Sequence, residues 1–178
     1  MMRWNGFGRS VAFAAVAGLG FGAALLVLAP VLGATGAIRL LLIGSAALYG
    51  AGLAPRPRQA LAAGLVGSAG GALLWLLPLG VVDTALGAAA ILALVRSGLL
   101  YRARPLRGCL AEIGLQGGGL ALAAFLAQGS ALSLALGVWG YFLVQSVFFL
   151  IGGVEARARH EPRDPFDRAR AELLALLR

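Results

Sequence analysis

The fold is decided by an apolar run near the N-terminus, residues 10–32, which reads SVAFAAVAGLGFGAALLVLAPVL. It contains no charged residue and is long enough to cross the hydrocarbon core of a bilayer, which takes ~20 residues. Arg3 and Arg9 precede it, as basic residues precede the apolar region of a secretory signal. That region is shorter in a signal, roughly 7–15 residues, and no small-x-small cleavage site follows here. We therefore expect a retained transmembrane helix.

Comparable apolar segments follow along the rest of the chain. They cover residues 36–54, 59–79, 84–101, 108–127 and 131–153. With 60% hydrophobic and only 12% charged residues, the chain has too little charge to cover the surface of a soluble domain. Lipid admits only helices or closed barrels, and no segment alternates with the period of a strand. The sequence predicts an all-α integral membrane protein, a six-transmembrane-helix bundle over residues 1–153.

The basic residues predict the orientation of these helices. All 15 are Arg, and all except Arg39 and Arg96 lie before the first segment, in alternate loops, or in the tail. The loops around residues 30–37, 78–83 and 128–131 contain none. Arginine-rich loops stay in the cytoplasm, so we expect both termini there.

The composition also bears on localisation and partners. Abundant Ala, Leu and Gly beside Arg without Lys is typical of a GC-rich genome, and we expect a bacterial cytoplasmic (inner) membrane. The net charge of +8 fits attraction to anionic membrane lipids, worth about 1 kcal/mol per basic residue near the surface. No aromatic residues are interleaved with the loop Arg residues to stack on bases, so we do not expect nucleic acid as a partner.

Small residues recur at helical spacing in three segments, as Gly-x-x-x-Gly. The predicted helix-packing residues are Gly18, Gly22, Gly67, Gly71, Gly114 and Gly118. Four residues place both glycines on one helix face, where a neighbouring backbone can approach closely. We expect tight packing within one bundle, and the alternative is a seam for another subunit. The similar surroundings of these glycines also suggest three repeated helical hairpins, although Ala/Gly/Leu-rich helices align readily by chance.

Charged residues inside the apolar segments are the clearest candidates for a functional role. Arg96 and Glu112 lie on consecutive segments, and an unpaired charge at mid-helix costs about 2.5–3.5 kcal/mol on insertion scales. We predict that they form an intramembrane charge pair; the alternative is a path for an ion or substrate. Arg39 and Asp83 are a similar possible pair at the outer face. Three glutamines are expected to hydrogen-bond across helices: Gln116, Gln128 and Gln145.

The residues that usually carry catalysis or metal binding are scarce. The only histidine, His160, lies in the tail, and Cys109 is the only cysteine. Asp83 and Glu112 are expected near opposite faces of the membrane, too far apart for acid–base work. No phosphate-binding loop of the Walker type occurs. The sequence therefore predicts no enzyme, no catalytic residue, no metal and no cofactor.

A polar cytoplasmic tail, residues 154–178, follows the last apolar segment. Asp164 is a plausible N-cap and Pro165 suits the first helical position, so we predict an amphipathic helix over residues 164–178. Its apolar stripe, the predicted partner-docking surface, contains Phe166, Leu173, Leu176 and Leu177. A helix this short is marginal alone, so we expect it to dock on protein.

Two function classes fit these features. The first is a non-catalytic subunit, scaffold or assembly factor of a larger bacterial membrane complex, with other membrane or membrane-associated subunits as partners. The alternative is a transport component, either a substrate-binding membrane subunit or a small oligomeric carrier, with Arg96, Glu112 and Gln116 lining its path. A polar cavity at mid-membrane would favour transport, and a solid core of small residues would favour the scaffold.

Overall fold

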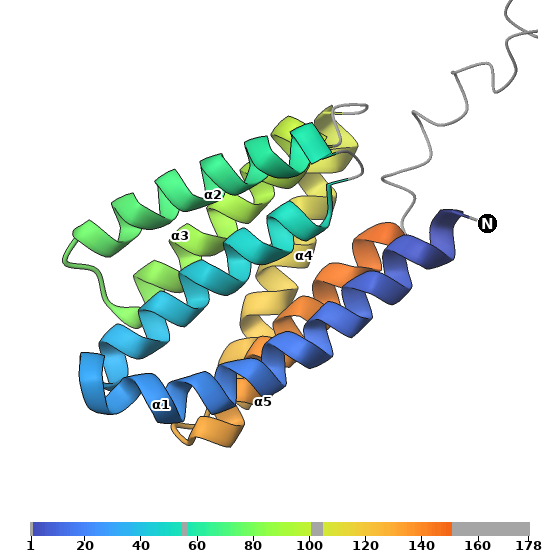
Figure 1. The fold of residues 1–178 in the computed structure, drawn as a ribbon. Helices are drawn as coiled ribbons and strands as arrows, with labels where there is room; N and C mark the ends of the chain where they lie inside the picture. The colour runs from blue at the N-terminus through green and yellow to red at the C-terminus, as the bar shows by residue number, and fades with distance from the viewer. Residues whose placement is uncertain (1, 55–56, 101–104, 151–178) are drawn as a thin grey trace, which may run out of the picture.

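The computed structural model describes residues 2–54, 57–100 and 105–150, and every regular element in these ranges is a helix (Figure 1). In chain order they are α1 (Met2–Gly52), α2 (Pro57–Leu76), α3 (Val81–Ala93), the π-helix η1 (Leu94–Leu100), α4 (Pro105–Leu126), α5 (Ala131–Ser146) and the 3₁₀-helix η2 (Val147–Phe149). The all-helical prediction is confirmed for this part of the chain. Three helical stretches are long and apolar enough to cross a membrane: Gly6–Gly52, Pro57–Leu76 and Ala131–Phe149.

Helix α1 covers the first two apolar segments and consists of two helices joined at a kink. Gly33, at the kink, has φ 74° and ψ 157°, a backbone conformation that residues with a Cβ rarely adopt. Pro30, one turn earlier, has no N–H to donate to the helical ladder. The chain therefore reverses at Gly33 with almost no loop, and the two halves of α1 lie in different parts of the bundle (Figure 1).

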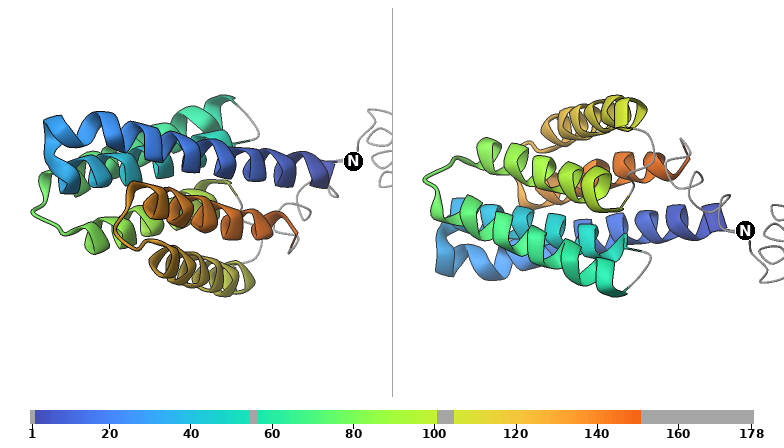
Figure 2. Two further views of the ribbon diagram at one scale, coloured as in Figure 1. Left: turned by 90° about the horizontal axis from the view of Figure 1, so that it is seen from below. Right: turned by 90° about the horizontal axis from the view of Figure 1, so that it is seen from above.

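The helices form a bundle in which α4 is peripheral. The N-terminal half of α1 packs mainly against α5, and the C-terminal half packs against α2 and α3. Helix α4 packs mainly on α5, with a smaller contact to α3 and η1. Figure 2 shows α4 on the outside of the bundle, beyond α3 and α5 as seen from α1 and α2. One side of α4 is therefore left without a helical neighbour among the described elements.

The connections divide between the two ends of the bundle. One end of the bundle holds the start of α1, the last residues of α1, the first residues of α2 and the last residues of η2 (Figure 1). The kink of α1 and the turns from α2 to α3 and from α4 to α5 lie at the other end. Among the described residues, Arg9 and Arg58 lie near the start of α1 and the start of α2, at the first end.

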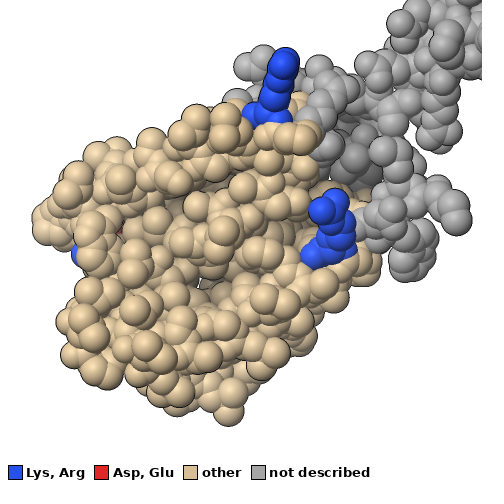
Figure 3. All heavy atoms as spheres, in the orientation of Figure 1, with Lys and Arg blue, Asp and Glu red and all other residues tan. Residues whose placement is uncertain are grey.

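Large apolar side chains cover the outside of the molecule. Leu19, Val31 and Leu76 are 79%, 79% and 80% exposed, while much of the interior is alanine and glycine. In the view of Figure 3, Arg residues appear only near the ends of the molecule, and most of the face carries no charge. This distribution suits a chain surrounded by lipid, because a water-soluble protein of this size would place charged residues over its surface.

Two of the sequence predictions concern parts of the chain outside the described residues. The tail, 154–178, and its predicted helix, 164–178, lie there with all four residues of the docking stripe. That prediction, like the threefold hairpin repeat, stays a prediction.

Candidate functional site

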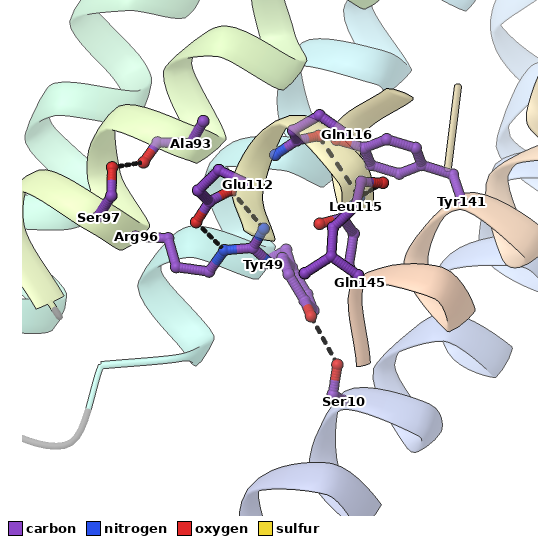
Figure 4. Close-up of polar contacts among 10 residues, drawn as sticks. All are labelled: Ser10, Tyr49, Ala93, Arg96, Ser97, Glu112, Leu115, Gln116, Tyr141 and Gln145. Carbon is purple, nitrogen blue, oxygen red and sulfur yellow. Dashed lines mark hydrogen bonds and ion pairs between the residues drawn. The ribbon is translucent and has the colours of Figure 1, made fainter. Parts of the chain in front are cut away.

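The structure joins Arg96 of η1 to Glu112 of α4 in a bidentate ion pair (Figure 4). Arg96 Nε donates to Glu112 Oε1 and Nη2 donates to Oε2, both at 2.5 Å. Both residues are buried, and the guanidinium carbon lies 4.4 Å from the centroid of the Phe148 ring. Two buried charges are tolerated where their geometry is good and they cancel. The apolar interior therefore holds a pair without net charge.

Arg96 is carried by an unusual backbone. Residues 94–100 form a π-helix, a conformation with i→i+5 hydrogen bonds that is rare and is frequently found at functional sites. The wider turn changes the direction of the side chains relative to a continued α-helix. Ser97 Oγ donates to the carbonyl of Ala93 at 2.5 Å, next to the start of this stretch. Sequence patterns did not predict this π-helix; only the charge of Arg96 within an apolar segment marked the region.

A second set of polar contacts joins α4 to α5. It contains Gln116, one turn beyond Glu112 on α4, and Tyr141 and Gln145 of α5. Tyr141 Oη donates to Gln116 Oε1 at 2.5 Å. Gln145 Nε2 donates to the Leu115 carbonyl at 3.0 Å and contacts Gln116 Oε1 at 3.4 Å. Gln116 and Gln145 thus hydrogen-bond between α4 and α5, as expected from the sequence.

Together these side chains make up what we call the buried polar cluster: Arg96, Glu112, Gln116, Tyr141 and Gln145. Three of its polar atoms have no hydrogen-bond partner although they are buried, namely Arg96 Nη1, Gln116 Nε2 and Gln145 Oε1. A buried polar atom without a partner costs about 1–3 kcal/mol. The buried polar cluster therefore has unused hydrogen-bonding capacity, two donor groups and one acceptor.

The N-terminal half of α1 is fixed to the opposite side of α5 by aromatic residues. Phe13, Tyr49 and Phe142 have ring centroids 4.9–5.1 Å apart. The Tyr49 hydroxyl and Ser10 Oγ are 2.6 Å apart, and both residues are buried. Nothing in the sequence indicates that residues 10 and 49 meet, since they are 39 positions apart.

Two of the three predicted glycine pairs lie at close helix contacts. A Cβ at Gly18 would lie 2.8 Å from Trp139 Cβ, and one at Gly22 would lie 3.2 Å from Ala135 Cβ, both on α5. The second pair faces the C-terminal half of α1. There a Cβ at Gly67 would lie 3.2 Å from Ala47, and one at Gly71 only 2.4 Å from Ile43 Cγ2.

The third pair differs from the expectation. A Cβ at Gly114 or Gly118 would meet no described atom within 4 Å, so these residues do not pack inside the bundle. Gly119 faces α5 instead, where its Cβ would lie 3.0 Å from Gln145 Nε2 and 3.0 Å from the Tyr141 ring. Consecutive residues of an α-helix point in directions about 100° apart. Gly119 can therefore face α5 while Gly118 faces away from the bundle.

The possible Arg39–Asp83 pair does not form among the described residues. Arg39 Nη2 donates to the carbonyls of Leu74 and Leu77 at 2.7 and 2.8 Å, where α2 ends. Asp83 Oδ2 instead accepts from the Gly80 N–H at 3.3 Å, and no ion pair joins Arg39 to Asp83 in the described structure. Carbonyls at a helix C-terminus lack intrahelical donors and attract a cation.

Gln128 also departs from its expected role. Its Nε2 donates to the carbonyl of Phe125, three residues earlier, so the amide serves its own turn at the end of α4. A glutamine at a helix end can satisfy a free carbonyl locally, which removes the need for a partner on another helix.

The described residues offer no metal site, and the chain matches no known protein. Among residues 2–54, 57–100 and 105–150, no group of three or more His, Cys, Asp or Glu could hold a metal ion. Comparison with protein-family models, curated proteins and solved structures gives no match.

Proposed function

We propose that the chain is a six-span protein of the bacterial inner membrane with both termini in the cytoplasm. The six crossings would be the two halves of α1, then α2, α3 with η1, α4, and α5 with η2. Their connections alternate between the two ends of the bundle, and the Arg residues of the sequence follow the same alternation. The cytoplasmic end would be the one where α1 starts.

Labelling of single cysteines tests this orientation. In a Cys109→Ala background, Thr35→Cys and Ser130→Cys should react with an impermeant thiol reagent added to intact cells. Arg104→Cys should react only after the cells are opened. The opposite pattern would reverse the orientation, and reaction of all three from outside would refute the alternation.

We further propose that the protein acts as a non-catalytic subunit, scaffold or assembly factor of a larger membrane complex. The observation that carries this proposal is the α4 outer face, defined by Leu110, Ile113, Gly114, Gly117 and Gly118, all exposed. A Cβ at any of the three glycines would meet no described atom within 4 Å.

The chemistry of the α4 outer face fits another transmembrane helix. Lipid tails give apolar helices no hydrophobic reason to associate, so helix pairs in membranes depend on close packing and on small residues. Glycines four residues apart, with a third between them, let a second backbone approach within contact distance. Leu110 and Ile113, 71% and 64% exposed, would pack beside that helix.

A pair of matched substitutions tests the role of the α4 outer face. Gly118→Leu adds bulk where no described atom lies, so the fold should be kept while any close helix partner is displaced. Gly20→Leu is the control, because Gly20 of α1 is also exposed and also meets nothing within 4 Å. The expected result is loss of co-purifying membrane proteins in mild detergent from Gly118→Leu alone. If both variants keep every partner of the unmodified protein, the α4 outer face is not a subunit contact.

The cytoplasmic tail is a second proposed docking element, on sequence grounds alone. Removing residues 164–178 touches no apolar segment, so insertion should be unaffected while a partner bound through the Phe166/Leu173 stripe would be lost. Phe166→Ala with Leu173→Ala should have the same effect as the deletion. Retention of all partners by the truncated chain would reject this docking role.

A transport component is the second candidate, and a separate observation favours it. The buried polar cluster places unpaired hydrogen-bonding atoms in an apolar bundle, where a scaffold has no use for them.

A further inference from the structure

We propose that the buried polar cluster binds a small uncharged molecule that both accepts and donates hydrogen bonds. Water and compact amide or hydroxyl solutes share this chemistry. The inference does not depend on the subunit role of the α4 outer face, and its test has a different readout.

The charge of the site defines the charge of its ligand. Arg96 and Glu112 cancel one another in a bidentate pair. Tyr141, the other titratable residue of the buried polar cluster, is uncharged as a phenol at neutral pH. A charged ligand would leave a net charge in an apolar interior, which costs several kcal/mol per uncompensated ion. The site therefore favours a neutral molecule.

The unpartnered atoms define the hydrogen bonds. Arg96 Nη1 and Gln116 Nε2 are donors without acceptors, and Gln145 Oε1 is an acceptor without a donor. A ligand that meets them must carry lone pairs and at least one polar hydrogen. A carboxamide, a urea, an alcohol or a water molecule has both.

Exchanging the O and N assignments of the Gln116 and Gln145 side-chain amides would conflict with their hydrogen bonds. Gln145 Nε2 must be a donor because it faces the Leu115 carbonyl. Gln116 Oε1 is then the acceptor, because it lies 3.4 Å from Gln145 Nε2, and it also accepts from the Tyr141 hydroxyl. The Leu115 carbonyl thus orients Gln145, and Gln145 orients Gln116, so the free donor of Gln116 and the free acceptor of Gln145 follow from the contacts.

The three atoms belong to one region of the fold. Glu112, which holds Arg96, and Gln116 are four residues apart on α4, so they share a face and lie about 6 Å apart along the axis. Phe148, which Arg96 stacks on, follows Gln145 by three residues and lies on the same side of α5 and η2. Figure 4 shows Arg96, Glu112, Gln116 and Gln145 gathered where η1, α4 and α5 meet.

A purely structural role leaves these atoms unexplained. Packing alone needs neither the second amide nor the free guanidinium nitrogen, and native proteins leave few buried polar atoms unpaired. A site of this polarity suits a bound molecule, since a buried water typically makes two to four hydrogen bonds to such groups. The π-helix that carries Arg96 is a further feature frequent at functional sites.

The test uses acetamide and acetate, which have nearly the same shape and differ in charge. The full chain, labelled at glutamine side-chain amides, is placed in lipid nanodiscs and followed by NMR while either compound is added. We expect acetamide to shift the Gln116 and Gln145 amide signals saturably. Acetate should bind more than about tenfold more weakly, since tenfold corresponds to only 1.4 kcal/mol.

Variants and a water measurement complete the test. Gln145→Met should abolish the acetamide response at Gln116, and Gln128→Met, whose amide bonds only its own turn, should leave it unchanged. Magnetisation transfer from water to the two amides, without an acetamide response, would identify water as the bound molecule. If neither the acetamide response nor the magnetisation transfer from water is observed, the proposal is overturned. If acetate binds as tightly as acetamide, the charge argument is overturned. These two results come from the unmodified chain, so they hold even if Gln145→Met fails to fold.

Discussion

Two glycines of the α4–α5 pair should respond oppositely to the same substitution. A Cβ at Gly137 of α5 would lie 2.9 Å from the Ala123 carbonyl oxygen and 3.3 Å from Ala127 Cβ. The first contact is with backbone, so α4 itself would have to move. A Cβ at Gly118 of α4 would meet nothing within 4 Å. Alanine should therefore be harmful at Gly137 and harmless at Gly118.

The magnitude follows from two terms. Forcing an extra methyl into a packed contact costs typically 1–3 kcal/mol. Alanine also favours the helical backbone over glycine by about 1 kcal/mol, and this gain applies at both positions. Gly118→Ala should then be stabilised by up to about 1 kcal/mol, and Gly137→Ala should lie between no change and a loss of about 2 kcal/mol. The propensity term cancels in the difference, which should be about 1–3 kcal/mol.

Reversible unfolding in mixed micelles measures this difference on the purified chain. The fraction of folded protein is followed as denaturing detergent is increased, with the unmodified chain as reference. Gly118→Ala should be the more stable of the two variants. Equal losses for both would refute the reasoning, because they would mean that the α4 outer face is covered in the purified protein.

Three further substitutions test the polar contacts by the same unfolding measurement. Glu112→Gln should cost about 3–5 kcal/mol because it leaves a buried Arg96 unpaired, and adding Arg96→Gln should recover part of that loss; strict additivity would mean that the pair is not coupled. Arg39→Ala should cost about 1–3 kcal/mol because the carbonyls at the end of α2 lose their donor, and no loss would show that water replaces it. Tyr49→Phe should cost about 1 kcal/mol through the hydrogen bond to Ser10, whereas an unchanged stability would mean that the hydroxyl contributes nothing.

The helices could be predicted from the sequence because they depend on local patterns of residues. Apolar runs of bilayer length must be helical in lipid, and Gly or Pro near their ends marks the turns. The reversal expected between residues 32 and 36 occurs at Gly33, whose positive φ needs a residue without a Cβ. Arg96 and Glu112 were predictable as partners because a charge inside an apolar segment has few acceptable neighbours.

The direction in which each helix faces was not predictable, because it depends on contacts between distant residues. The motif Gly114/Gly118 is identical in spacing to Gly18/Gly22, yet only the latter faces a neighbour. The rotation of α4 is set by Gln116 and by the two residues of α5 that bind there, and their meeting is not encoded in any local pattern. Arg39 was assigned the wrong partner for a related reason: helix-end carbonyls are as attractive as a carboxylate, but they carry no signal in the sequence.

Helix α4 carries both proposals, on faces that point apart. Gln116 and Gly118 are two residues apart and so differ by about 200° around the helix axis. Gln116 lies in the buried polar cluster, and a Cβ at Gly118 would meet no described atom. Bulk added at Gly118 would therefore not touch the amides, and an amide exchanged for an apolar group would not change the α4 outer face. Loss of a partner and loss of acetamide binding can thus be separated by substitutions on one helix. If Gly118→Leu removed both, the partner would have to hold α4 in the position that forms the buried polar cluster.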